Sequence, residues 1–303
     1  MRSFKDIITL AKKKNKKRCI VVMAEDSTVL EGVKLAENIG IVIPVLVGNK
    51  TEIVQCAERI NFDLARAEIH DARDAAATME LAVKIVRDQG DFLMKGMISS
   101  SQFLKGILDK KYGLRTGNIL SHVAVLEVPA YHKLIFMSDG GMNPRLDLAS
   151  RVGIIKNATI ILRKIGLSNP KIAIIAASET IHPDMPETTD AVKIVEMNKN
   201  REIPDCIIEG PFGFDVAVSR EAAVHKNITS KIAGDVDFLL MPSISAANIW
   251  AKGLILFAGA QAAGTIAGAA RPVVMLSRAD TPATKLNSIA LGVILSEGTH
   301  VPD

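Results

Sequence analysis

The chain of 303 residues has few cysteines, few aromatic residues and a nearly balanced charge. Its cysteines, Cys19, Cys56 and Cys206, are too few and too widely spaced for a disulfide framework or a CxxC zinc knuckle. They are expected to be buried or incidental thiols in a reducing compartment. The 37 basic and 33 acidic residues leave a formal charge of +4, which does not indicate a nucleic-acid-binding protein but is compatible with anionic small molecules.

Several nucleotide, metal and hydrolase motifs are absent from the sequence. No GxGxxG motif follows the first apolar run, and no GxxxxGK[ST], HExxH or GxSxG motif occurs, which weakens dinucleotide, ATP, zinc-protease and α/β-hydrolase interpretations. The six histidines are scattered without metal-ligand spacing. A mechanism without a metal or a resident cofactor is expected.

Neither a secretory signal nor a membrane span is predicted, so the expected location is cytoplasmic. The basic run at residues 12–18 indicates a solvated end of an amphipathic helix rather than a targeting or nucleic-acid patch. The segment 253–270 is apolar, but it is rich in Ala and Gly, contains Gln261 and is flanked by Lys252 and Arg271. It predicts a buried helix followed by a tight turn.

Short apolar runs alternate with amphipathic stretches of helix length, which is typical of an α/β protein with largely parallel sheets. The runs predicted to form strands are residues 19–23, 41–48, 92–96, 122–128, 134–139, 171–177, 206–210, 237–242 and 272–276. Ligands of such folds bind at the carboxyl ends of the strands.

Polar residues follow several of the predicted strands. They are Lys95, Asp139, Glu209 and the pair Ser277-Arg278. Each one alone is explained by helix capping or turn formation. Together they favour a shared cleft that binds anions.

The junction at residues 272–291 shows this pattern best. "PVVML" predicts a strand and "TPATKLNSIALGVI" a helix, with Thr281 as N-cap and Pro282 in the first turn. Ser277 and Arg278 would then lie at a helix N-terminus, where N–H groups favour a bound anion. In the alternative interpretation Ser277 is a cap, Arg278 extends into solvent and Asp280 stabilises the first turn.

The string "SRADTPATKLNSIAL" (277–291) resembles the C-terminal signature of the phosphate acetyl/butyryltransferase family, and more particularly its butyryltransferase branch. Further matching strings are "FLMKGMISSSQFLKGIL" (92–108), "GLRTGNILSHVAVLEVP" (113–129), "HPDMPETTDA" (182–191) and the long segment 209–249. The resemblance covers essentially the whole sequence in order.

The resemblance implies an enzyme that converts an acyl-CoA and phosphate into an acyl phosphate and free CoA. It implies an isopropylmalate-dehydrogenase-like architecture of two α/β domains with the active site in the interdomain cleft. The first domain is expected at residues 1–138 plus 271–303, and the second at residues 139–270. Expected partners are acyl-CoA or CoA and phosphate or acyl phosphate, with no nucleic acid or membrane. A homodimer or higher homo-oligomer is also expected, and the Ala/Gly-rich segment 258–270 supports it. Metabolic coupling to an acyl kinase is expected as well.

The resemblance also implies roles for particular residues. Ser277 would lie beside the CoA thiol, Arg278 would bind phosphate or polarise the carbonyl, and Asp280 is the predicted thiol base. In acetyl-specific members the proposed base lies seven positions after the serine, where this chain has Thr284. A first-turn role in the helix is the alternative for Asp280.

The predicted substrate-binding residues are Lys95, Ser99, Arg115, Thr116, Asn143 and Asp215. Lys95 with Ser99 and Arg115 with Thr116 resemble two anion-binding loops of the family. Asn143 and Asp215 are expected on the substrate side of the second domain. Three alternatives remain open: a phosphate acetyltransferase, a non-catalytic acyl-CoA or phosphate sensor, and a nucleotide-dependent dehydrogenase of similar shape. The missing fingerprint argues against the dehydrogenase, and a carboxylate beside two anionic ligands argues against the sensor.

Overall fold

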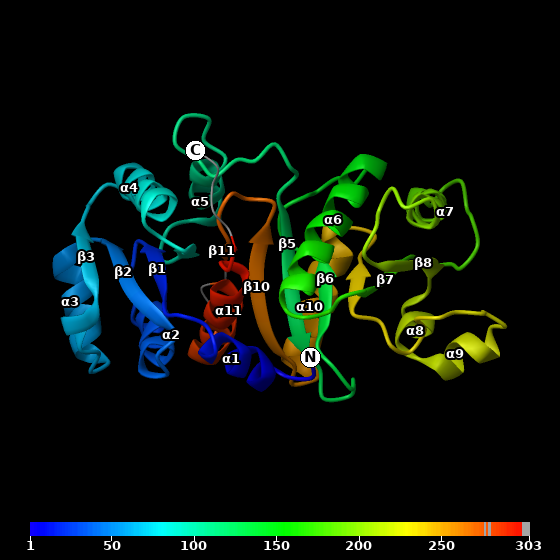
Figure 1. The fold of residues 1–303 in the computed structure, drawn as a ribbon, viewed down its shortest axis with the longest axis horizontal. Coiled ribbons are helices and arrows are strands. Elements are labelled where there is room, and N and C mark those ends of the chain that lie inside the picture. The colour runs from blue at the N-terminus through cyan, green and yellow to red at the C-terminus, as the bar shows by residue number, and fades with distance from the viewer. Residues whose placement is uncertain (276, 278–279, 299–303) are drawn as a thin grey trace. The chain divides into compact units, whose positions relative to one another are not determined.

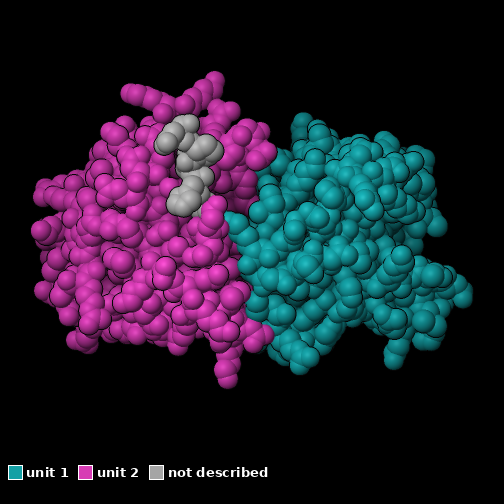
Figure 2. All heavy atoms as spheres, in the orientation of Figure 1, with its two compact units in different colours: residues 1–3, 119–262 teal, residues 4–118, 263–303 magenta. Residues whose placement is uncertain are grey.

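The computed structural model describes residues 1–275, 277 and 280–298 (Figure 1). The chain divides into two compact units. Unit 1 comprises residues 1–3 and 119–262, and unit 2 comprises residues 4–118 and 263–303 (Figure 2). Both units are α/β, as the alternation of apolar runs and amphipathic stretches predicts.

Unit 2 has a mostly parallel sheet of order β3-β2-β1-β4-β11-β10. Strand β1 pairs in parallel with β2 and β4, β2 with β3, and β4 with β11, whereas β10 and β11 are antiparallel. The strands are β1 (Lys17–Val22), β2 (Val42–Gly48), β3 (Glu68–Asp71), β4 (Phe92–Lys95), β10 (Gln261–Ala267) and β11 (Val273–Val274). Because β1 and β4 lie in the centre of this sheet, their buried residues at 19–22 and 92–95 are apolar except for Lys95.

The helices of unit 2 form two packed groups. Helix α11 contacts both α1 and α2, α2 also contacts α3, and α4 contacts α5. The bounds are α1 (Phe4–Lys12), α2 (Ser27–Asn38), α3 (Lys50–Arg59), the 3-10 helix η1 (Leu64–Arg66), α4 (Ala75–Asp88), α5 (Ser100–Ile107) and α11 (Pro282–Leu295). Helix α11 is buried at Lys285 and from Asn287 to Leu295, and its part from Ile289 onward consists only of apolar residues and glycine.

Unit 1 has a sheet of order β5-β6-β9-β7-β8, in which only the β5–β6 pair is antiparallel. Its strands are β5 (Ser121–Glu127), β6 (Ile135–Ser138), β7 (Lys171–Ile175), β8 (Ile207–Phe212) and β9 (Phe238–Leu240). Its helices are α6 (Leu148–Lys164), α7 (Pro186–Lys199), α8 (Phe214–Val218), α9 (Arg220–His225) and α10 (Ile244–Phe257). Residues of α8, α9 and α10 close the hydrophobic core over β5, β6, β7 and β9.

The nine predicted strands are all present, with ends shifted by a few residues. Two strands were missed. Strand β3 has no apolar run because none of its residues is buried, and β10 consists largely of Ala, Gly and Thr. The compact units also differ from the predicted domains: residues 119–138 lie in unit 1, because β6 pairs with both β5 and β9.

The interpretation of residues 253–270 was wrong in two respects. Helix α10 ends at Phe257, and after a short connection strand β10 occupies Gln261–Ala267. In addition, Ala247 is the buried residue of α10, and most of the helix is solvent-exposed or only half-buried. Within the described ranges, no helix combines the length and the apolar character needed to cross a membrane.

Candidate active site

A small pocket in unit 2 joins the end of β4 to the start of α11. Its lining residues are Asp26, Val29, Lys95, Gly96, Met97, Ser277 and Lys285. Two of them are buried lysines, since Lys95 is 4% and Lys285 is 2% exposed. The pocket therefore combines two ammonium groups, a carboxylate and a hydroxyl.

The turn after β4 places Lys95 in this pocket. The N–H groups of Gly96 and Met97 donate to the main-chain oxygens of Val22 and Met23 at 2.9 and 2.8 Å. A Cβ at position 96 would lie 2.1 Å from the Met23 oxygen, so the close approach of the two loops requires glycine there. The Lys95 ammonium also donates to the Gly96 oxygen at 3.3 Å.

Ser277 and Asp280 form a closed turn before α11. The Ser277 N–H donates to Oδ2 of Asp280 at 2.8 Å, and the Asp280 N–H donates to the Ser277 oxygen at 3.2 Å. Thr281 then caps α11 by accepting the N–H of Thr284, and Pro282 occupies the first turn, as predicted. Arg278 lies outside the described residues.

Lys285 reaches the pocket from the first turns of α11. Its ammonium donates to the main-chain oxygen of Asp280, and its stem packs on Gly32 of α2, where a Cβ would lie 2.5 Å from Cβ of Lys285. Burial lowers the pKa of Lys285, and the charges of Asp280, Asp26 and Glu31 oppose this shift. The lysine is thus held beside Ser277 in a poorly solvated position.

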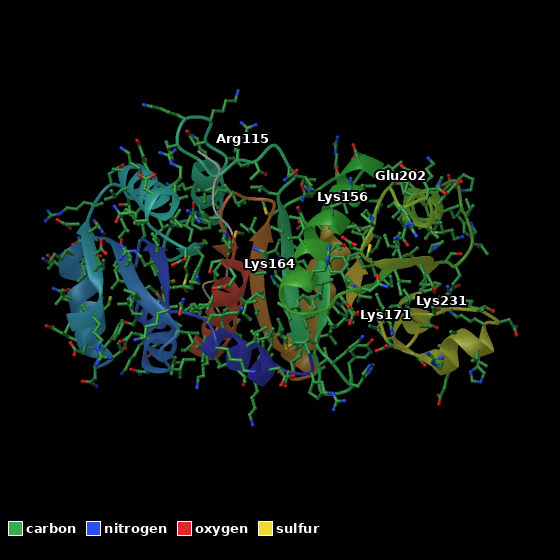
Figure 3. All side chains as sticks on the ribbon, in the orientation of Figure 1. Arg115, Lys156, Lys164, Lys171, Glu202 and Lys231 are labelled. Carbon is green, nitrogen blue, oxygen red and sulfur yellow. The ribbon has the colours of Figure 1, made fainter. Side chains whose placement is uncertain are left out.

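Ser99, Arg115 and Thr116 belong to unit 2 but do not line this pocket. Ser99 caps α5 by accepting the Gln102 N–H at 3.2 Å. Arg115 lies on the loop between α5 and β5 and is exposed (Figure 3). It forms an isolated bridge with Ala269, and the hydroxyl of Thr116 donates to the Gly268 oxygen at 2.6 Å. This loop is therefore anchored to the segment after β10.

Asp139 and Asn143 form a hydrogen-bonded turn at the end of β6 in unit 1. The Asp139 carboxylate is fully buried and accepts the main-chain N–H groups of His122, Gly141 and Met142. Nδ2 of Asn143 donates to Oδ2 of Asp139 at 2.5 Å and to the Leu120 oxygen at 2.8 Å. The hydrogen bonds of the Asp139 and Asn143 side chains therefore fix the shape of this loop.

Asp215 is placed at the start of α8 in unit 1 and is half exposed. It pairs with Lys226 at 3.0 Å, and Lys226 also pairs with Glu179 at 2.7 Å. The hydrogen bond from Lys226 lowers the pKa of Asp215.

Glu209 was predicted to follow a strand, but it lies inside β8. Its carboxylate accepts hydrogen bonds from the Ser230 hydroxyl and from the main-chain N–H of Lys231.

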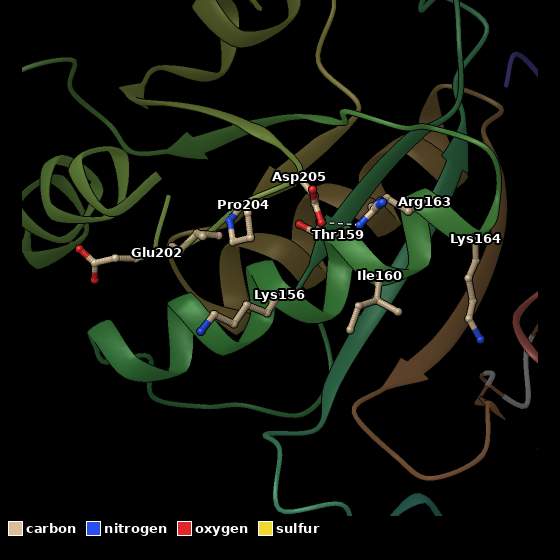
Figure 4. A pocket seen from close by; sticks show the side chains of 9 residues that line it. Lys156, Thr159, Ile160, Arg163, Lys164, Glu202, Pro204 and Asp205 are labelled. Atoms are coloured by element: carbon tan, nitrogen blue, oxygen red, sulfur yellow. Dashed lines mark hydrogen bonds and ion pairs between the residues drawn. The ribbon is translucent and has the colours of Figure 1, made fainter. Parts of the chain in front are cut away.

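A larger pocket of about 520 Å³ lies between α6 and the loop before β8 in unit 1 (Figure 4). It is lined in part by Lys156, Ile160, Arg163 and Asp205. None of the residues predicted for the site contributes to it. Across the described residues there is also no group of three or more His, Cys, Asp or Glu side chains that could hold a metal ion.

Sequence reasoning missed Asp26 and Lys285 as pocket residues. Asp26 follows β1 and accepts the Val29 N–H as the N-cap of α2, so it could have been found by the strand-end argument that selected Lys95. Lys285 shares a helix face with Ser288 and Gly292, both buried. A lysine on such a face is a signal of a partnered or functional charge.

Comparison with known proteins identifies the family. The family model for phosphate acetyl/butaryl transferase matches residues 3–90 and 80–293. The chain belongs to this family. Phosphate butyryltransferase of Clostridium beijerinckii is 39% identical to it over 97% of this chain and 98% of that protein. Phosphate acetyltransferase of Thermotoga maritima is 37% identical over 96% and 98%.

A solved structure of the family has the same fold. The branched-chain phosphotransacylase of Enterococcus faecalis V583 matches this chain with a TM-score of 0.83 and 30% identity. The match covers 93% of this chain and 99% of that one. The described pocket of Lys95, Ser277 and Lys285 therefore belongs to a member of an enzyme family that transfers acyl groups.

Proposed function

We propose that this enzyme interconverts a short-chain or branched acyl-CoA and phosphate with an acyl phosphate and free CoA. The pocket beside the Ser277–Asp280 turn is the observation that supports this function most directly, because it places two buried ammonium groups next to a serine and an aspartate. Family membership gives the reaction class. Butyryl-CoA is the proposed main substrate, and acetyl-CoA is the second candidate, since both kinds of relative are similar to the chain.

The reaction needs positioning and charge stabilisation more than a nucleophilic side chain. A phosphate oxygen attacks the thioester carbonyl, a tetrahedral oxyanion forms, and the CoA thiolate leaves and takes a proton. The two anionic substrates repel each other unless cations and hydrogen-bond donors hold them together. Acyl transfer by this route involves no change in oxidation state.

The predicted residues have separable roles in this scheme. Lys95, Ser99, Arg115 and Thr116 bind the phosphate group in our proposal, and Asn143 and Asp215 act on the acyl-CoA side. Ser277 donates a hydrogen bond at the sulfur, and Arg278 polarises the carbonyl. Asp280 exchanges the proton with the CoA sulfur, which in the reverse direction makes the thiolate that attacks the acyl phosphate.

The decisive experiment follows free thiol after the protein is mixed with butyryl-CoA and phosphate. The expected result is thiol release that depends on phosphate and is matched by acyl phosphate, trapped with hydroxylamine. Release without phosphate would indicate a thioesterase, and no release with any acyl-CoA would indicate a binding protein. Catalytic efficiencies across acetyl-, propionyl-, butyryl- and isobutyryl-CoA give the acyl preference. Two substrates that differ by one methylene are expected to differ by about 1–3 kcal/mol in transition-state binding.

We further propose a cytoplasmic homo-oligomer whose acyl phosphate product is consumed by an acyl kinase. Exposed apolar residues on α10 support self-association, because Ile249, Leu256 and Phe257 are 71%, 74% and 92% exposed. Large apolar side chains exposed on one helix favour an interface there. The Ala/Gly-rich segment 258–270 is a weaker basis for it, since most of that segment is strand β10.

A further inference from the structure

Lys285 is a buried cation that lies near carboxylates without pairing directly with one in the described part of the chain. It is 2% exposed, and within the described residues its ammonium forms no ion pair and donates to the neutral main-chain oxygen of Asp280. An ammonium carries three N–H donors. Taking such a group out of water costs free energy unless a counter-charge or further acceptors compensate.

The nearby carboxylates already accept main-chain hydrogen bonds. Oδ1 of Asp26 accepts the Val29 N–H at 2.7 Å, and Oδ2 of Asp280 accepts the Ser277 N–H at 2.8 Å. Lys95 lines the same pocket as a second buried ammonium. The residues that line this pocket carry two ammonium groups and one carboxylate, that of Asp26. The lining therefore keeps a net positive charge, which a bound anion would compensate.

We propose that Lys285 is a substrate-binding residue that, together with Lys95, holds an oxygen of the phosphate or acyl phosphate group beside Ser277. This inference rests on the proposed function and adds to it a residue that sequence reasoning did not select. Phosphate provides a counter-charge and acceptor oxygens for the Lys285 ammonium. Gly32 makes the arrangement possible, because a side chain there would displace the Lys285 stem.

The proposal predicts a link between phosphate affinity and pH. The charges of Asp280, of Asp26 at the N-cap of α2 and of Glu31 in α2 act on Lys285. Lys95 of β4 lines the same pocket. Burial lowers its pKa in the free enzyme, and a bound anion raises it by favouring the ammonium form. Phosphate affinity is therefore full below the free-enzyme pKa of Lys285 and falls as pH rises through it.

The test uses Lys285→Met, Lys285→Arg and the control Lys34→Met in the full-length enzyme. Lys34 also donates to a main-chain oxygen, that of Ile60 at 2.7 Å, but it does not line the pocket. Lys285→Met is expected to raise the phosphate Michaelis constant about 10- to 100-fold, the loss typical of one hydrogen bond to a charged group. The Michaelis constant for acyl-CoA should change far less, and Lys34→Met should change neither constant.

The pH profile separates substrate binding from a structural role. Lys285→Arg keeps the positive charge and does not titrate in the accessible range, so kcat/KM for phosphate should lose the part of its alkaline decline that is due to Lys285. Calorimetric titration with inorganic phosphate in buffers of different ionisation enthalpy should show proton uptake above neutral pH in the wild-type enzyme and less in Lys285→Arg.

The outcomes distinguish this inference from the proposed function. A wild-type protein without phosphate-dependent thiol release would refute the proposed function itself. An active wild type whose phosphate Michaelis constant is the same in Lys285→Met would refute the role of Lys285. Equal losses toward phosphate and acyl-CoA, with an unchanged pH profile in Lys285→Arg, would also overturn it in favour of a purely structural lysine.

Discussion

The carboxylate of Asp280 accepts the main-chain N–H of Ser277 at 2.8 Å. This bond gives Asp280 a structural role in the turn and, at the same time, holds a carboxylate next to the serine that we propose lies at the CoA sulfur. The two roles can be separated by mutation, because an asparagine oxygen accepts the same hydrogen bond but does not take up the proton.

We therefore predict that Asp280→Asn lowers turnover about 10²- to 10⁴-fold, the usual contribution of a general acid–base group. The Michaelis constants for phosphate and CoA should change little, because the turn is retained. Steady-state kinetics in both directions measure these quantities. Asp280→Ala removes the turn hydrogen bond as well and is expected to raise the Michaelis constants in addition. Near-normal turnover in Asp280→Asn would remove the carboxylate from the mechanism.

Arg115 provides a second test, on the loop anchored by Thr116 and Ala269. Its exposed guanidinium is suited to bidentate contact with phosphate oxygens. Arg115→Ala should raise the phosphate Michaelis constant far more than the one for CoA, measured with the other substrate saturating. Lys110→Ala, which removes another exposed cation from the same loop region, should leave both constants unchanged. Equal effects of Arg115→Ala on both substrates would contradict the assignment.

The sequence was sufficient to predict the elements that depend on local pattern. The nine apolar runs form strands, and Thr281 with Pro282 begins α11 as capping rules require. Strand β3 and strand β10 were missed because their residues lack that pattern: β3 is only partly buried, and β10 is built from small residues. Helix α10 was expected to be buried because it is apolar, but hydrophobicity alone does not tell a core from an exposed face.

The site was predictable only in part, because pocket residues come together through tertiary packing. Lys95 and Ser277 were selected as strand-end residues, and the structure places them in one pocket. Lys285 was not selected, since its position depends on the close approach of α11 to Gly32 of α2. Asp139 was selected for its place after a strand, yet its carboxylate mainly organises the loop through buried hydrogen bonds.

The cluster around Asp235 in unit 1 makes stability depend on pH. Burial alone would raise the pKa of Asp235, but hydrogen bonds from Lys133, Lys171 and His132 outweigh it and hold the pKa well below its usual value. The folded state thus binds the proton more weakly than the unfolded state does. The stabilisation is full above the unfolded pKa of about 3.9 and is lost as pH falls below it toward the folded pKa.

We predict that Asp235→Asn lowers the melting temperature at neutral pH and that the difference from wild type shrinks as pH falls below about 4. Thermal unfolding followed by circular dichroism over a pH series measures this difference. Asp63→Asn is the control, because that carboxylate accepts a main-chain N–H in a surface turn and forms no ion pair in the described part of the chain. A gap between wild type and Asp235→Asn that stays constant down to acid pH would show that the ion pairs do not stabilise the fold.

The exposed face of α10 gives the test of oligomeric state. Ile249 and Leu256 are seven residues apart, so they lie on one face of the helix, and Phe257 extends the same apolar surface. Burial of this surface against a second copy would remove three large side chains from water, at about 1.5–3 kcal/mol for each one fully buried. Leu256→Asp would place an unpaired carboxylate in that contact and should shift the enzyme to monomers in light scattering coupled to size exclusion. Ile160→Asp, on an exposed position of α6, is the matched control and should leave the mass unchanged. A wild-type enzyme that is already monomeric, or a Leu256→Asp variant of unaltered mass, would exclude α10 as the interface.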